Sequence, residues 1–148
     1  MTATEHLRCE HEAALAVSCG LFDLIEHYPR ERDAYAVVLQ LTKLVGLLRI
    51  HLIHEDVDLY PALSALEDGN VGKLAQSYSQ EMGGLALELE QFARHWASSA
   101  VIAIDFDEFR AAAHDFLLTL AVRIEREDRY LYPLADAALR GQDKQKVS

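Results

Sequence analysis

Two copies of one short motif carry the residues best suited to chemistry. Residues 55–61 read Glu-Asp-Val-Asp-Leu-Tyr-Pro, and residues 127–133 repeat five of these seven types as Glu-Asp-Arg-Tyr-Leu-Tyr-Pro. His51 stands four residues before Glu55, and Arg123 stands four residues before the second glutamate. On a helix, residues four apart lie on one face, so His51 and Glu55 can hold one metal ion together. The repeat suggests two helical hairpins, each offering half of a site.

The elements that must position these residues are helices. The chain has only 3 prolines and 7 glycines and is rich in alanine and leucine, and no alternating strand pattern interrupts it. We expect an all-α fold, an antiparallel up-down four-helix bundle, as one domain over residues 1–141 with a polar tail at 142–148. The expected helices cover residues 4–27, 31–66, 71–98 and 105–140. Asp105 and Glu108 form a capping-box pattern at the start of the last one.

Pro61 and Pro133 fall inside the second and fourth expected helices. Proline removes a backbone donor and crowds the preceding turn. Each proline therefore predicts a kink, or the point at which one helix ends and a short one begins.

Apolar residues spaced three or four apart place the motif residues in the core. His51 and Glu55 continue the apolar stripe of the second helix, and Arg123 and Glu127 continue that of the fourth. His11 lies on the corresponding stripe of the first helix. Charged groups are almost never buried without compensation. We therefore expect a metal ion in the bundle centre, or an ionic cluster in which these residues compensate each other.

The third helix leaves its register open. Its apolar stripe can be drawn through Glu81 or through Met82 with equal regularity. Periodicity therefore does not decide which of these two residues faces the centre, and a role for Glu81 as a metal ligand stays open.

Length, composition and charge narrow the function classes. The chain has 148 residues, 51% of them hydrophobic, with a formal net charge of −10. This acidity argues against nucleic acid or an anionic membrane as a partner. We expect no signal peptide, because residues 1–5 lack its basic and apolar regions, and no apolar run approaching the roughly 20 residues that span a bilayer. Cys9 and Cys19 are expected to be free thiols, which indicates the cytoplasm.

The order of these motifs resembles the hemerythrin-like HHE cation-binding family. A histidine on the first helix precedes His-x-x-x-Glu and Asp-x-x-Leu-Tyr-Pro on the second, and the Glu-Asp-x-x-Leu-Tyr-Pro motif returns on the fourth. The resemblance covers about residues 5–140. It implies an up-down bundle with a non-haem di-iron centre, in proteins that bind dioxygen or respond to nitric oxide, peroxide or iron.

The resemblance carries over only in part. It implies four metal ligands in this chain: His11, His51, Glu55 and Glu127. Arg123 replaces the fourth-helix histidine, and the third-helix histidine falls at Met82. Arginine cannot lose its proton to ligate a metal, and methionine is a poor ligand for iron. Whether the site holds one iron ion, two or none is therefore left open by the sequence.

Three functions follow from this resemblance. The leading one is a cytoplasmic protein that binds non-haem iron and senses or handles dioxygen, nitric oxide or peroxide. The alternative is a metal-free bundle that acts in signalling or regulation through a protein partner, with Arg123 bridging Glu55 and Glu127. A redox enzyme that decomposes peroxide is the third. A protein partner or a homodimer stays open, and we expect no nucleic acid or membrane partner.

Overall fold

The computed structural model describes residues 2–27, 34–66 and 69–147, except for the side chains of residues 142–147. The regular elements within these ranges are all helical. In chain order they are α1 (Glu5–His27), α2 (Ala34–His54), η1 (Glu55–Leu59), α3 (Tyr60–Ser64), α4 (Gly69–His95), α5 (Ser99–Ile104), α6 (Phe106–Arg126), η2 (Glu127–Leu131) and α7 (Tyr132–Val147).

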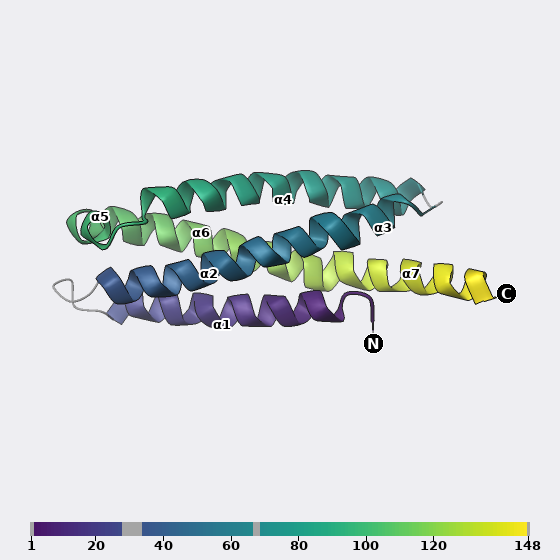
Figure 1. Ribbon diagram of the computed structural model, residues 1–148, viewed down its shortest axis with the longest axis horizontal. Helices are drawn as coiled ribbons and strands as arrows, with labels where there is room; N and C mark the ends of the chain where they lie inside the picture. Colours follow the sequence, from purple (N-terminus) through teal and green to yellow (C-terminus); the bar gives the residue numbers. More distant parts are fainter. Residues whose placement is uncertain (1, 28–33, 67–68, 148) are drawn as a thin grey trace.

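These helices form four long rods that lie side by side (Figure 1). One rod is α1, the second is α2 continued by η1 and α3, the third is α4, and the fourth is α6 continued by η2 and α7. The first rod packs against α2 and α6, and α4 packs against α2, α3 and α7. The expected all-α up-down bundle is therefore confirmed.

The structure differs from the predicted helices at two places: an additional short helix precedes α6, and the last helix ends later than expected. Residues 99–104 form the short α5, whose N-cap Ser98 accepts a hydrogen bond from the backbone of Ala100. Asp105 does occupy the N-cap of α6, but its side chain makes no capping hydrogen bond. The last helix continues past Gly141 to Val147, because a single glycine lowers helix propensity by only about 1 kcal/mol.

The two motif prolines are accommodated by π-helical turns. The segments η1 and η2 directly precede the pairs Tyr60–Pro61 and Tyr132–Pro133. In each turn the tyrosine N–H bonds to the carbonyl five residues earlier, that of Glu55 or Glu127. The prediction that the prolines mark a change of helix is confirmed, and the change is one of winding. Such turns are frequent at functional sites.

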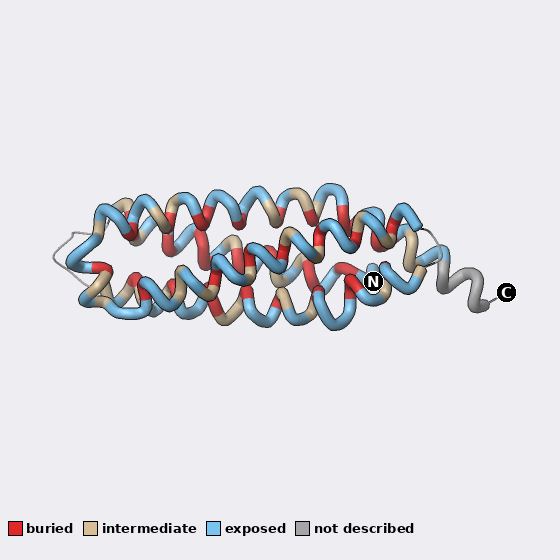
Figure 2. Tube along the Cα trace, turned by 90° about the horizontal axis from the view of Figure 1, so that it is seen from above, coloured by how far each residue is buried: buried red, intermediate tan, exposed pale blue. Residues whose placement is uncertain are grey.

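The inward faces of the rods make one continuous core (Figure 2). Leu44, Leu63 and Ile102 are completely buried. Burial of each such side chain stabilises the fold by roughly 1.5–3 kcal/mol. On α4 the buried stripe runs through Met82 and leaves Glu81 partly exposed, which settles the register that periodicity left open.

The second rod also exposes several large apolar side chains. Leu39, Ile50, Ile53 and Val57 are among them. By length and composition the segment Ala34–Ser64 could cross a membrane, so the prediction that no apolar run is long enough is wrong. In the structure its inner side packs in the bundle core.

Candidate metal centre

Three of the four rods each contribute to a cluster in the middle of the bundle. His11 comes from α1, His51 from the last turn of α2, Glu55 from the start of η1, and Glu127 from the start of η2. All four residues are at least 97% buried. The structure thus brings together the four residues predicted as metal ligands.

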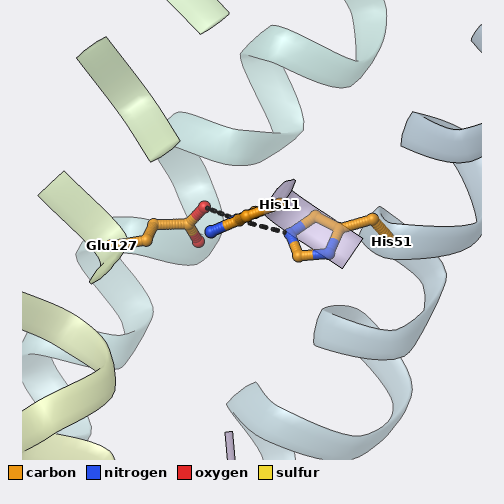
Figure 3. Close-up of side chains that lie close together, drawn as sticks. All are labelled: His11, His51 and Glu127. Atoms are coloured by element: carbon orange, nitrogen blue, oxygen red, sulfur yellow. Dashed lines mark hydrogen bonds and ion pairs between the residues drawn. The ribbon is translucent and has the colours of Figure 1, made fainter. Parts of the chain in front are cut away.

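The facing atoms are spaced as ligands of one ion would be. His11 lies between the other two side chains drawn in Figure 3: its Nε2 is 2.9 Å from His51 Nε2 and 3.3 Å from Glu127 Oε1. His51 Nε2 is also 3.1 Å from Glu55 Oε1. Ligand atoms about 2.1 Å from a shared metal ion lie about 3 Å apart. One ligand atom from each of His11, His51 and Glu127 fits within a span of 4.8 Å.

Two carboxylates outside this cluster orient the histidine rings. His11 Nδ1 is 2.7 Å from Asp128 Oδ1, and His51 Nδ1 is 3.0 Å from Glu10 Oε1. An ionised carboxylate can only accept, so each ring carries its proton on Nδ1 and donates it outward. The two Nε2 atoms then face each other with lone pairs. This contact is stable only when a cation, a proton or a metal ion, lies between them.

In each glutamate, as in each histidine, one polar atom is hydrogen-bonded outside the cluster and the other points into it. Tyr132 donates its hydroxyl proton to Glu55 Oε2 at 3.1 Å, and Tyr60 donates to Glu127 Oε2 at 3.5 Å. The inner oxygen of each carboxylate, Oε1, is buried and faces an imidazole nitrogen: His51 Nε2 lies 3.1 Å from that of Glu55, and His11 Nε2 lies 3.3 Å from that of Glu127. Four buried atoms that can ligate a metal ion, two nitrogens and two oxygens, therefore converge. A divalent cation fits this donor set.

The pKa values describe what the cluster does without a metal ion. Burial raises the pKa of Glu127 well above its usual value, and the neighbouring Glu55 raises it further. Burial opposes ionisation of Glu55 too, but hydrogen bonds with Glu127 and His51 outweigh it, so its pKa is lowered. For His51, burial is outweighed by hydrogen bonds to Glu55 and Glu10, and the pKa is raised. The metal-free cluster therefore retains protons that a metal ion would displace.

The remaining histidine responds in the opposite direction. Burial lowers the pKa of His11, and the charge on His51 lowers it further, against the opposing effect of Asp128. His11 is therefore disposed to remain neutral, which is the form that ligates a metal ion.

Arg123 does not lie in the core, contrary to the sequence prediction. Its guanidinium pairs with the carboxylate of Glu81 on α4, and Arg126 binds the same oxygen at 3.0 Å. The Arg123 side chain is 25% exposed. The long arginine side chain reaches solvent here and so avoids the cost of burying its charge. Arg123 therefore does not bridge Glu55 and Glu127, and Glu81 is no part of the cluster.

The place of the missing third-helix histidine is apolar. Met82 faces inward, and a cavity of about 10 Å³ lies beside it. The cavity adjoins His11, His51 and Glu127, and its apolar wall includes Leu85, Leu89, Phe116, Leu120 and Ile124. The ligand set present thus suits one ion. At the position of a second ion, the residues that replace the family's histidines are Met82 and Arg123, and Arg123 points outward to Glu81.

The sequence reasoning missed Glu10 and Asp128, which support the histidines. Glu10 also accepts a hydrogen bond at 2.6 Å from Nδ1 of the half-exposed His54. Asp128 belongs to the repeated motif, and its repetition was the only available signal. Its counterpart Asp56 is exposed, so repetition alone would have been ambiguous.

Comparison with known proteins agrees with this arrangement. The Hemerythrin HHE cation binding domain matches residues 2–135 of the chain. Searches of the curated proteins and of the solved structures returned no match. The family match spans nearly the whole bundle and includes all four clustered residues. The chain therefore belongs to the hemerythrin HHE cation-binding domain family.

Proposed function

We propose that this protein holds a single non-haem iron ion with His11, His51, Glu55 and Glu127 and senses or handles dioxygen, nitric oxide or peroxide. One observation carries the proposal: four buried atoms that can ligate a metal ion, Nε2 of the two histidines and Oε1 of the two glutamates, converge at neighbour distances of 2.9 to 3.3 Å. Outer hydrogen bonds hold the histidine protons and the other carboxylate oxygens away from this point.

The donor chemistry favours iron. Two imidazoles with carboxylates form the donor type of non-haem iron sites that keep open positions for a ligand. Both cysteines are exposed on α1, away from the buried cluster, so no thiolate serves it. Manganese and zinc accept similar donors, and metal analysis distinguishes them. The free, exposed thiols also support our proposal of a cytoplasmic location.

The size of the cavity favours a very small ligand. About 10 Å³ is the room that one water-sized molecule needs. The wall between Met82 and Ile124 is apolar, so it favours a diatomic molecule or peroxide over a charged metabolite. Bound iron would supply ligand binding and electron transfer. The residues of the chain hold the ion, keep protons on the outer ring nitrogens and exclude bulk water.

A second candidate function is a metal-free bundle that acts through a protein partner. The exposed apolar side chains of Ile50, Ile53 and Val57 favour it. The outward position of Arg123 argues against it, because no arginine then neutralises Glu55 and Glu127.

Metal analysis of untagged protein, expressed with iron supplied, tests the proposal. We expect close to one iron per chain in the wild type and none in His51→Ala. His27→Ala, which changes an exposed histidine on the same bundle, is the matched control and should keep its iron. Two irons per chain would reject the single-ion centre. Wild-type protein without bound metal would favour the partner-binding bundle.

A further inference from the structure

We propose that Tyr132 is a fifth ligand of the metal ion, through its phenolic oxygen. This proposal rests on the function proposed above, because it assigns a further residue to the same centre. The Tyr132 side chain is completely buried, and its hydroxyl points into the donor cluster.

The hydroxyl oxygen contacts three of the four proposed ligand residues. It lies 3.2 Å from His11 Nε2, 3.4 Å from His51 Nε2 and 3.1 Å from Glu55 Oε2. A hydroxyl has one proton, and Glu55 takes it. The lone pairs of the oxygen therefore point toward Nε2 of His11 and Nε2 of His51, which we propose bind the same ion. Its separations from them match those expected between ligand atoms on one ion, about 3 Å.

The internal repeat provides a comparison, because Tyr60 occupies the same motif position as Tyr132. The Tyr60 hydroxyl donates to Glu127 Oε2 at 3.5 Å, and no contact with a histidine nitrogen is found for it among the described residues. Each tyrosine reaches across to the glutamate of the other half. Glu55 has His51 beside it, whereas the counterpart of His51 is Arg123, which points away to Glu81. Only Tyr132 therefore meets imidazoles.

The ring of Tyr132 is held in this position from several sides. Its backbone N–H closes the π-helical turn onto the carbonyl of Glu127, which links two proposed ligands by one hydrogen bond. The ring stacks on His11 with centroids 5.2 Å apart, and the Arg8 guanidinium lies 5.4 Å from its centroid. Burial and the charges of Glu127 and Glu55 raise the pKa of the Tyr132 hydroxyl, so it keeps its proton until a metal ion displaces it.

Ligation would follow a simple proton balance. The O–H bond of Tyr132 breaks, the oxygen forms the bond to the metal ion, and the proton is released to solvent, as is usual when a metal binds its ligands. The phenolate and the two carboxylates together supply three negative charges. That sum matches a ferric ion, and phenolate oxygen is a hard donor suited to it.

Visible absorption separates this arrangement from a hydrogen-bonding role. Ferric iron bound to phenolate absorbs visible light through ligand-to-metal charge transfer, and iron bound only to imidazole and carboxylate lacks that transition. We would load the full chain with iron, oxidise it in air, and measure iron content and spectrum for wild type, Tyr132→Phe and Tyr60→Phe. Both variants remove one hydroxyl at matched positions.

Tyr60→Phe loses its hydrogen bond to Glu127, so the spectra are compared per bound iron. On that basis we expect the wild type and Tyr60→Phe to show the band and Tyr132→Phe to lose it. A band that persists in Tyr132→Phe would overturn the proposal. Wild-type protein that binds iron without the band would also overturn it, yet leave the proposed function intact. Absence of iron from the wild type would overturn both the proposed function and the assignment of Tyr132 as a ligand. If Tyr132→Phe does not fold, resonance Raman spectra of the wild type decide, because only a ligated tyrosine gives enhanced phenolate ring vibrations.

Discussion

His11 Nε2 and His51 Nε2 lie 2.9 Å apart, while each ring donates its Nδ1 proton to a carboxylate on its other side. This relationship joins the first two rods at the centre of the bundle. It also means that Glu10 and Asp128, which contact only the outer ring nitrogens, determine which histidine atoms point into the cluster.

Replacement of these carboxylates should weaken metal binding. We expect Glu10→Gln to lower iron affinity by about 10–100-fold, because the amide no longer fixes the Nδ1 proton of His51 as strongly. Asp128→Asn should act similarly through His11. Competition with a chelator measures the loss. The control is Glu12→Gln, an exposed glutamate on the same helix. Equal affinity for Glu10→Gln and Glu12→Gln would contradict this role.

Stabilisation by the metal ion should grow as pH rises. The pKa values of His51 and Glu127 are raised in the metal-free fold, chiefly because hydrogen bonds outweigh burial for His51 and because of burial for Glu127. Their protonated forms stabilise the metal-free fold at low pH. That contribution is lost as pH rises through the raised values, above 6.5 for His51 and above 4.5 for Glu127.

A metal ion competes with these protons. The difference in melting temperature between iron-loaded and metal-free protein should therefore increase with pH through this window. Scanning calorimetry at several pH values measures it. A constant difference would indicate that the ion displaces no protons from the cluster.

Arg123→Ala should be nearly neutral for stability. Its ion pair with Glu81 is partly exposed, at 25% and 35% of the two side chains, so its loss should cost no more than about 1 kcal/mol. Urea unfolding of metal-free Arg123→Ala, Glu81→Ala and the double variant gives the pair energy. A cost of about 3–5 kcal/mol would instead place Arg123 in a buried ionic cluster.

A second metal position should be restorable. Met82→His combined with Arg123→His puts imidazoles at the inward position of α4 and one turn before Glu127, beside the existing cavity. The change also removes the guanidinium charge. We expect iron content to rise from one to two per chain. The control pairs Arg123→His with Glu81→His, whose side chain is partly exposed, and should stay at one. Equal iron content in both double variants would reject this placement of the second position.

Much of the centre could be predicted from local sequence patterns. Spacings of three and four place His11, His51, Glu55 and Glu127 on apolar stripes, and an amphipathic helix buries such a stripe. The bundle follows for the same reason, since four such helices can bury their apolar faces only against one another. The repeated prolines likewise predicted a break in regular winding, because proline lacks the N–H that a regular helix requires.

The tertiary structure decided what depends on the rotation of one helix against another. Both Met82 and Glu81 fit the spacing of an apolar stripe on one helix. Which of them is buried depends on how α4 is rotated about its axis against the neighbouring helices. Arg123 lies on the same stripe as Glu127. Its long side chain nevertheless extends toward solvent, where the guanidinium pairs with Glu81 on another helix.

The hydrogen bonds that support the proposed ligands were also decided by the packing of the helices. Glu10 meets His51, Asp128 meets His11, and Tyr132 meets Glu55 across helices that are far apart in the sequence. No periodicity encodes such pairs. The sequence by itself determined which residue types gather in the bundle centre. The packing of the rods decided which of their atoms face one another there, because hydrogen bonds between helices depend on distances that only the assembled fold sets.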